Sequence, residues 1–133
     1  MYKVTRIIHF CYGHRLLNYD GKCKYLHGHN AKAEVELSSA KLDHRGMVMD
    51  FNEVKQRLQT WIDNTLDHKL LLNEADPLVP TLTQLKEPFV TLKSNPTAET
   101  IAKFIFDHAK AEGFPVTEIK LWETSSSFAT YRE

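Results

Sequence analysis

The chain has 133 residues, a length that predicts one compact domain over 1–133. Hydrophobic residues make up 42% and charged residues 26%, a balance that argues against a disordered chain. Lysine plus arginine and aspartate plus glutamate each number 17, so the basic excess typical of nucleic-acid binders is missing and we expect no nucleic-acid partner.

Membrane and secretory patterns are also missing. No apolar run approaches the roughly 20 residues that span a bilayer, and the first residues lack the apolar core of a signal peptide. We therefore expect no membrane partner and a cytoplasmic location. Cys11 and Cys23 should be reduced in that compartment, although a single disulfide between them is the alternative.

The first part of the chain predicts two strands joined by a loop. Residues 2–14 alternate in the manner of a strand and are rich in β-branched side chains. Residues 15–26 are rich in Asn, Asp, Gly and Lys, which favours a loop. A second strand is predicted at 29–38, with one apolar face formed by Ala31, Ala33, Val35 and Leu37.

A turn, a short strand and a helix are expected next. The turn is predicted at 43–46 and the short strand at 47–50. Over about 51–65 the apolar residues recur with the 3.6-residue period of a helix, at Val54, Leu58, Trp61 and Ile62.

The remainder of the chain predicts a loop, a helix and two strands. Residues 73–96 contain four prolines, so this segment is expected to be mostly loop. A helix should begin at 95–97, where Asn suits the cap and Pro the first turn, and end at Gly113. Its apolar stripe is Ile101, Phe104, Ile105 and Ala109, and two final strands are predicted at 116–123 and 127–132.

This order of elements predicts an α+β fold. Strands at both ends of the chain favour a four-stranded antiparallel sheet with two helices on one face. Such a sheet has exposed edges, and pairing of edges between subunits is one way to cover them. A homo-oligomer is therefore expected.

Three histidines form the candidate metal site. His27 and His29 are separated by one residue, so in a strand their side chains point to the same face. Gly28 between them lets the backbone pass close to a neighbour. An antiparallel return through the loop would bring His14 beside the pair, giving three imidazoles and an open position, as in catalytic zinc sites.

Several alternatives remain open from the residues alone. The histidines could be polar residues on a solvated strand. Cys23 could be a fourth ligand of a closed structural site, or a thiolate base or nucleophile. Asp67 could orient the ring of His68, or both could face solvent at a helix end. Glu123 could face solvent, or it could hold a guanidine-like edge of a heterocycle from within a pocket.

Six stretches, taken in order, resemble the 6-pyruvoyltetrahydropterin synthase superfamily, and most of all its queuosine-pathway branch, the 6-carboxytetrahydropterin synthases. They cover most of the chain, and the ordered set is far more specific than any single stretch. They read F-C-Y-G-H-R-L from Phe10, C-K-Y-L-H-G-H-N from Cys23, G-M-V-M-D-F-N-E-V-K from Gly46, L-D-H-K-L from Leu66, N-P-T-A-E from Asn95 and W-E-T from Trp122.

The resemblance implies a role for each candidate residue. His14, His27 and His29 would hold Zn²⁺. Cys23 would be the catalytic thiolate, and Asp67 with His68 its acid/base partner. Glu123 would anchor the pterin ring, assisted by Glu99 and Thr97.

The resemblance also implies the fold, the assembly and the reaction. The fold would be the tunnelling fold, whose sheets join into a barrel between subunits, as trimers or hexamers with active sites between chains. The substrate would be 7,8-dihydroneopterin triphosphate, converted to 6-carboxy-5,6,7,8-tetrahydropterin with release of acetaldehyde and triphosphate. The alternatives are 6-pyruvoyltetrahydropterin synthase activity and a non-catalytic zinc- or pterin-binding protein.

This chain departs from the family pattern at two places, before the first zinc histidine and in the stretch 74–93. Tyr12 and Gly13 replace the usual small residues before the first zinc histidine, and Tyr12 is bulky. Cys11 matches no catalytic position of the family. The stretch 74–93 is longer than in compact members and is either a lid or a surface insertion.

Overall fold

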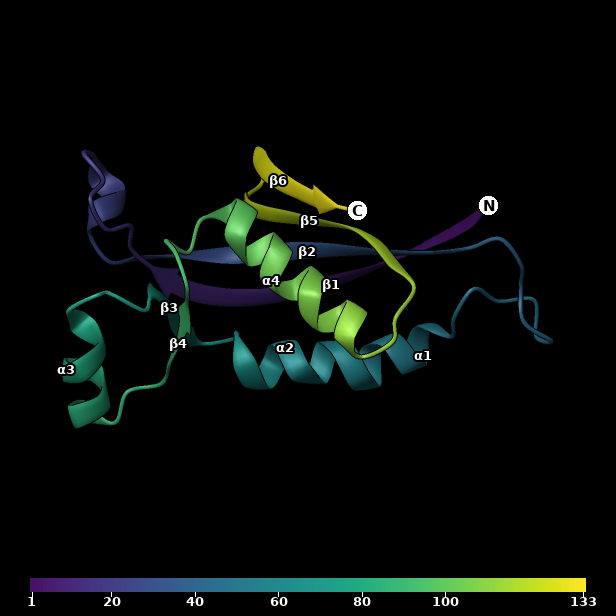
Figure 1. The fold of residues 1–133 in the computed structure, drawn as a ribbon, viewed down its shortest axis with the longest axis horizontal. Helices are drawn as coiled ribbons and strands as arrows, with labels where there is room; N and C mark the ends of the chain where they lie inside the picture. The colour runs from purple at the N-terminus through teal and green to yellow at the C-terminus, as the bar shows by residue number, and fades with distance from the viewer.

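Six strands form one curled, mixed sheet in the computed structural model, which describes residues 1–133 (Figure 1). The order across the sheet is β4-β3-β1-β2-β5-β6. β1 pairs with β2, β2 with β5, and β5 with β6, all antiparallel. On the other side of β1, β3 and β4 run parallel to it. The bounds are β1 (Tyr2–His14), β2 (His27–Ser39), β3 (Lys69–Asn73), β4 (Phe89–Leu92), β5 (Val116–Thr124) and β6 (Ser127–Arg132).

The α+β class is confirmed, but the predicted sheet of four antiparallel strands is incomplete. The four predicted strands correspond to β1, β2, β5 and β6, which are consecutive in the sheet. The two additional strands, β3 and β4, are only 5 and 4 residues long. Such short apolar runs carry too few residues to show a strand period.

The predicted first helix is confirmed as a continuous helical stretch. It consists of α1 (Phe51–Val54), a π-helical segment (Lys55–Gln59) and α2 (Thr60–Thr65). A 3₁₀ turn (Lys22–Lys24) lies in the loop between β1 and β2. The other helices are α3 (Leu78–Leu85) and α4 (Ala98–Ala111). None of the helices is long and apolar enough to cross a membrane.

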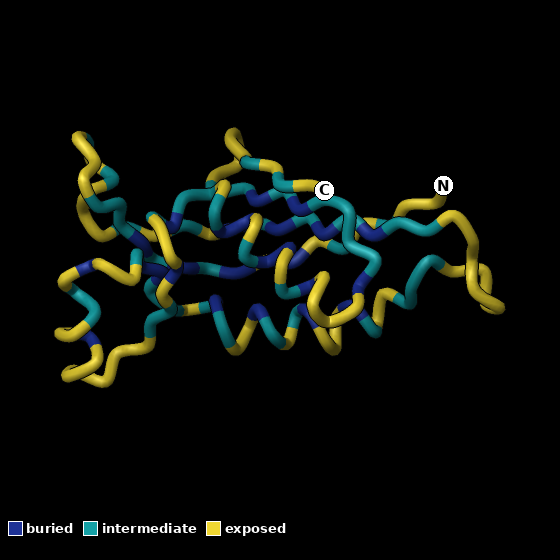
Figure 2. The backbone as a smooth tube through the Cα atoms, viewed as in Figure 1, coloured by how far each residue is buried: buried dark blue, intermediate teal, exposed yellow.

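One hydrophobic core of 21 buried residues lies between the helices and one face of the sheet (Figure 2). The predicted alternation holds in both long strands, since Ile8 and Phe10 of β1 and the predicted apolar face of β2 are buried. The predicted helix stripes supply the opposite layer, with Val54, Leu58, Ile62, Ile101, Ile105 and Ala109 fully buried.

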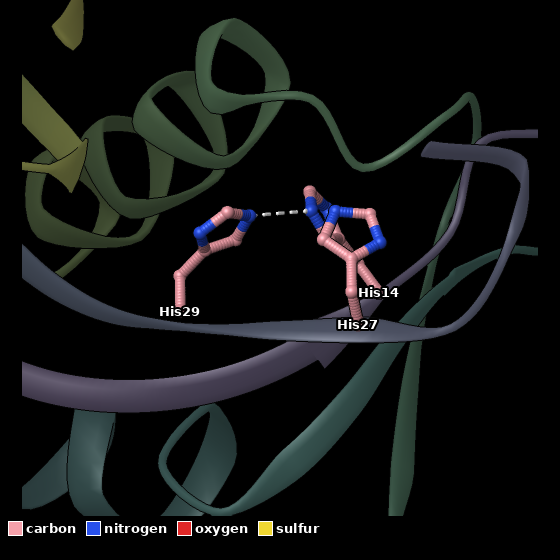
Figure 3. Close-up of side chains that lie close together, drawn as sticks. All are labelled: His14, His27 and His29. Carbon is pink, nitrogen blue, oxygen red and sulfur yellow. Dashed lines mark hydrogen bonds between the residues drawn. The ribbon is translucent and has the colours of Figure 1, made fainter. Parts of the chain in front are cut away.

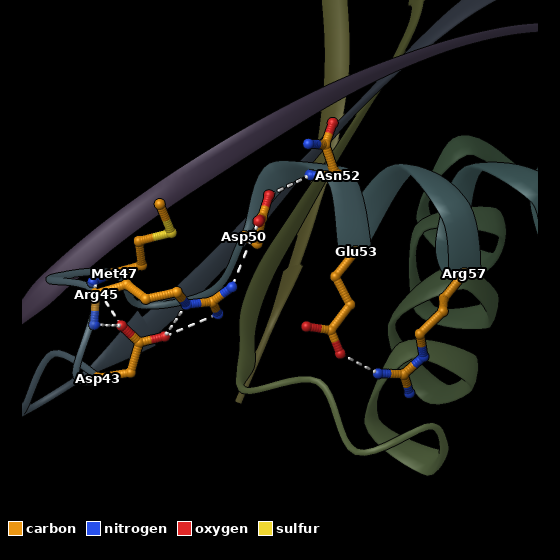
Figure 4. Close-up of polar contacts among 7 residues, drawn as sticks. All are labelled: Asp43, Arg45, Met47, Asp50, Asn52, Glu53 and Arg57. Atoms are coloured by element: carbon orange, nitrogen blue, oxygen red, sulfur yellow. Dashed lines mark hydrogen bonds and ion pairs between the residues drawn. The ribbon is translucent and has the colours of Figure 1, made fainter.

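The short strand predicted at 47–50 is wrong. The turn predicted at 43–46 is confirmed, and the Asp43 carboxylate closes it by accepting from the backbone N–H groups of Arg45 (2.8 Å) and of Met47 (3.0 Å), the first residue of the predicted strand (Figure 4). Asp50 then caps α1 by accepting a backbone N–H two residues ahead at 2.8 Å. Asp43 thus occupies the N–H of Met47, a donor that a strand would offer to its neighbour.

The segment 73–96, predicted as mostly loop, contains α3 and β4. Its prolines are compatible with a helix because of their positions. Pro77 is the N-cap and Pro80 is the third residue of α3, where backbone N–H groups have no partner within the helix.

Helix α4 begins where predicted, but Thr97 rather than Asn95 is its cap. The Thr97 hydroxyl accepts from the backbone N–H of Thr100 at 3.2 Å. The amide side chain of Asn95 instead exchanges two hydrogen bonds of 2.9 Å with the backbone of Leu17. The start of α4 is thereby tied to the loop that follows β1.

A second tie to this loop is the ion pair between Arg15 and the buried Asp76. Arg15 Nε donates to Asp76 Oδ2 at 2.8 Å, and Asp76 is only 2% exposed. Asp76 Oδ1 also accepts from the backbone N–H of Leu78, the first residue of α3. The bond to Arg15 is the largest influence on the carboxylate and lowers the pKa of Asp76.

We expect Asp76→Asn to lower the free energy of unfolding by about 1–3 kcal/mol at neutral pH, because a charged hydrogen-bond partner of Arg15 is lost. Since the folded pKa of Asp76 is depressed, its contribution is complete above the ordinary carboxyl pKa of 3.8 and is lost as the pH falls through the lower folded value. The difference between the two proteins should therefore shrink in acid. Urea unfolding between pH 7 and pH 3 measures it, with exposed Glu74→Gln as the control.

Candidate metal centre and adjoining cavities

The three candidate histidines meet because of the register between β1 and β2. His14, the last residue of β1, is directly opposite His27, the first residue of β2. Tyr12 is opposite His29. Alternate residues of a strand share a face, so His27 and His29 both point toward the side on which His14 is buried. The antiparallel return predicted from the sequence is confirmed.

The imidazole rings converge on one another (Figure 3). The Nε2 atoms of His14 and His29 are 3.1 Å apart. The ring centroids of His14 and His27 are 4.5 Å apart, and those of His27 and His29 are 5.1 Å apart. The potential ligand atoms of all three lie within 4.8 Å of one another, and this group includes no cysteine.

Backbone carbonyls orient two of the rings. The Nδ1–H of His14 donates to the carbonyl of Pro96 at 2.7 Å, and the Nδ1–H of His27 donates to the carbonyl of Tyr25 at 2.7 Å. In the neutral ring the proton on Nδ1 leaves the lone pair on Nε2. Burial is the largest influence on His14 and lowers its pKa, which favours this neutral form.

The geometry fits a zinc ion. Two nitrogen ligands about 2.0–2.1 Å from a tetrahedral zinc lie about 3.3 Å from each other. The separation of 3.1 Å between the Nε2 atoms of His14 and His29 is close to that value. Carbonyl acceptors on the remote ring nitrogens are the usual support of metal-bound histidines. His14, His27 and His29 are therefore suited to bind zinc and leave a position for another ligand.

Seven of the nine predicted site residues line one cavity of about 300 Å³. Helix α4 contributes its cap and first turn to the wall, while β5 and the 3₁₀ turn contribute a carboxylate and a thiol. The predicted residues in this cavity are His14, Cys23, His27, His29, Thr97, Glu99 and Glu123.

Glu123 lies in the cavity wall rather than on the solvent face of β5. Its Oε1 accepts from the Tyr12 hydroxyl at 2.9 Å and lies 3.7 Å from Nε2 of His14. Tyr12 is 3% exposed, and burial, followed by the charge of Glu123, raises its pKa far above the usual value. From the sequence, Tyr12 was noted only as a bulky residue. Its contact with Glu123 was not predictable, because it depends on how β1, β2 and β5 lie side by side in the sheet.

Asp67 and His68 contact each other but line a different part of the molecule. The Nδ1–H of His68 donates to Asp67 Oδ2 at 2.7 Å, so the orienting contact expected from the sequence is present. His68 lines a second cavity, of about 700 Å³, which shares only His27 and His29 with the first. Within this chain Cys23 and His68 therefore line separate cavities.

Cys11 is the neighbour of this pair that sequence reasoning missed. Its backbone N–H donates to Asp67 Oδ1 at 2.9 Å, and its Sγ lies 3.5 Å from Nδ1 of His68. Cys11 and Cys23 are both free thiols. The alternation of β1, which buries Phe10 and Tyr12, is the one sequence signal that places Cys11 on the opposite face.

Sequence comparison matches residues 3–133 to the family described as 6-pyruvoyl tetrahydropterin synthase. A curated relative from Rickettsia bellii, named 6-carboxy-5,6,7,8-tetrahydropterin synthase, is 38% identical over 139 residues. That alignment covers 96% of this chain and 98% of the relative.

Solved structures share the fold. An uncharacterized protein from Wolinella succinogenes superposes with a TM-score of 0.85 at 28% identity, covering 99% of this chain and 98% of the other. The 6-pyruvoyl tetrahydropterin synthase of Caenorhabditis elegans superposes with a TM-score of 0.74 at 24% identity, covering 99% of this chain and 95% of the other.

The metal centre leads to a direct prediction. Wild-type protein loaded with one equivalent of Zn²⁺ should retain it through dialysis, and His27→Ala should retain less because two imidazoles bind zinc far less tightly than three. Elemental analysis by mass spectrometry measures the content. His9→Ala is the matched control, since His9 is exposed on β1 outside the three-histidine group. Full zinc content in His27→Ala would show that the metal binds elsewhere.

Proposed function

Because the chain belongs to the 6-pyruvoyl tetrahydropterin synthase family, we propose that it converts 7,8-dihydroneopterin triphosphate to 6-carboxy-5,6,7,8-tetrahydropterin. Acetaldehyde and triphosphate would be released, as a cytoplasmic step of queuosine biosynthesis. The names of full-length relatives support the carboxy product. The observation that carries the proposal is the cavity in which three imidazoles, a thiol and a carboxylate come together.

The three histidines would hold zinc at the inner end of this cavity. When bound there, zinc supplies a Lewis acid for the oxygens of the substrate side chain. His14, buried and bonded to the Pro96 carbonyl, keeps its Nε2 lone pair aimed at the cavity. The walls from α4 and β6 restrict the access of water to the same space.

Cys23 would move protons at the substrate side chain. Its thiol lines the same cavity as the histidines but is outside the group of mutually close ligand atoms. This placement favours the acid/base role over the fourth-ligand alternative. A thiol next to bound metal and substrate can act as a proton donor or acceptor.

Glu123 would bind the pterin ring. Tyr12 donates to its Oε1, which leaves Oε2 and a remaining lone pair of Oε1 to accept N–H groups from the ring. Thr97 and Glu99 lie on the same cavity and would assist. A carboxylate held in one orientation by a buried hydroxyl suits paired hydrogen bonds to the planar edge of a heterocycle.

The Asp67–His68 pair would complete the proton relay from a second subunit. In one chain His68 and Cys23 line separate cavities, so a complete relay requires either a large rearrangement or another copy of the chain. The sheet offers edges for such an assembly, since β6 has a free edge and β1 pairs with β3 only over residues 12–14. We propose a trimer or hexamer joined through these edges.

Product analysis tests the reaction and the role of Cys23 together. Zinc-loaded protein should release acetaldehyde from dihydroneopterin triphosphate, and Cys23→Ala should lower the rate by about 10²–10⁴-fold, the usual contribution of a general acid or base, without loss of zinc. Mass spectrometry identifies the product. A 6-pyruvoyl product without acetaldehyde would identify the protein as a 6-pyruvoyltetrahydropterin synthase. Zinc binding without turnover would identify it as a non-catalytic zinc- or pterin-binding protein.

Glu123→Gln tests the pterin contact. The variant should raise KM about 10–100-fold, because a hydrogen bond to a charged group contributes about 1.5–3 kcal/mol. Zinc content should stay the same, since Tyr12 can still donate to the amide oxygen. Steady-state kinetics measure the effect, with Glu118→Gln on the same strand as the control. An unchanged KM would remove Glu123 from the binding site.

A further inference from the structure

The second cavity contains a cluster that the proposed reaction does not fully use. Cys11, Asp67 and His68 each present a potential metal-ligand atom, and these atoms lie within 4.8 Å of one another. The cluster opens on the cavity of about 700 Å³, whose lining includes Cys11 and His68. It is separate from the three-histidine group, with which it shares no residue.

The backbone holds this cluster in place. The N–H of His68 donates to the carbonyl of Cys11 at 2.8 Å, and the N–H of Cys11 donates to Asp67 Oδ1 at 2.9 Å. His68 also has a φ of 59°, a left-handed conformation that is unfavourable for a non-glycine residue. The fold therefore sustains a strained residue that brings the imidazole against the thiol.

The charge of the cluster suits a cation. Burial acts to raise the pKa of Asp67, but the hydrogen bonds from the Cys11 amide and the His68 ring outweigh it and lower the pKa below the usual value. Asp67 is therefore an anion at neutral pH. No lysine or arginine makes an ion pair with it, and its side-chain partner is the His68 ring at 2.7 Å.

The geometry matches the ligand spacing of a thiophilic divalent metal. A tetrahedral zinc with a sulfur at about 2.3 Å and a nitrogen at about 2.0–2.1 Å separates those two atoms by about 3.5 Å. Cys11 Sγ and His68 Nδ1 are 3.5 Å apart. Asp67 Oδ2 is 2.7 Å from the same nitrogen and needs a shift of about half an ångström to join as a third ligand.

We propose that Cys11, Asp67 and His68 form a second metal site, which binds a thiophilic divalent cation such as Zn²⁺ or Cd²⁺. Binding releases the thiol proton of Cys11 to solvent, and the ring proton of His68 moves from Nδ1 to Nε2, so that the ligating imidazole is neutral. A consequence, which rests on the proposed function, is inhibition: a metal on His68 withdraws the ring from proton transfer.

A single-thiol protein tests binding without reference to activity. The chain has two cysteines, so zinc-loaded Cys23→Ser retains Cys11 as its one thiol. Titration with Cd²⁺ should give one tight equivalent and an ultraviolet Cd–thiolate absorption band. Adding Cys11→Ser should abolish the band and weaken Cd²⁺ binding by more than about 100-fold. Loss of a residue that only supports a metal ligand weakens metal affinity by about 10–100-fold, so a larger loss identifies Cys11 as a ligand.

A further variant separates a built site from an isolated thiol. His68→Ala in the Cys23→Ser protein should keep the thiol but weaken Cd²⁺ binding at least about tenfold. Equal affinity with and without His68 would overturn the proposal, as would absence of the band in the Cys23→Ser protein. Circular dichroism confirms that each variant is folded.

Inhibition is tested separately on the wild-type enzyme. Zn²⁺ added beyond the first equivalent should lower the rate of acetaldehyde release, and Cys11→Ser should relieve this inhibition while leaving the rate at one equivalent unchanged. Equal inhibition of both proteins would overturn the link between the second metal and His68. A protein that binds Cd²⁺ as expected but never turns over the substrate would refute the proposed function and leave the second site standing.

Discussion

The candidate metal centre depends on the register of the β1–β2 ladder. His14 lies opposite His27, and Tyr12 lies opposite His29, so three rings and a phenol meet at the end of two long strands. A shift by one residue would turn the histidines of β2 to the other face, away from His14. The register is held by the core, because the apolar residues along the same strands are buried only in this alignment.

The long elements were predictable because their periods extend over many residues. The alternation in β2 and the stripe of α4 repeat often enough to identify both the element and its buried face. Shorter elements were missed because local chemistry decides them. Asp43 closes the turn expected at 43–46 but also binds the N–H of Met47, the first residue of the strand expected at 47–50, and the prolines of α3 fall at positions where a helix tolerates them.

The candidate site divides in the same way. His27 and His29 were predictable as a pair from their spacing, and His14 required only a hairpin-like return. The contact between Cys11 and His68 was not predictable, since it depends on the parallel pairing of β3 with the end of β1 and on a left-handed backbone at His68. The backbone carbonyls that orient His14 and His27 were also not predictable, because every residue has a carbonyl and the sequence does not show which one accepts.

The buried bond between Tyr12 and Glu123 makes one carboxylate serve two purposes. A phenol that is 3% exposed needs an acceptor, and Glu123 provides it at 2.9 Å. If Glu123 binds the ligand as proposed, changes at position 123 would alter both ligand recognition and the folding stability of this chain, whereas a small residue at position 12 would separate the two effects. Under the proposed role of Glu123, a new ring specificity would then arise through a change at position 12 first, after which position 123 could vary without leaving a buried phenol unpaired.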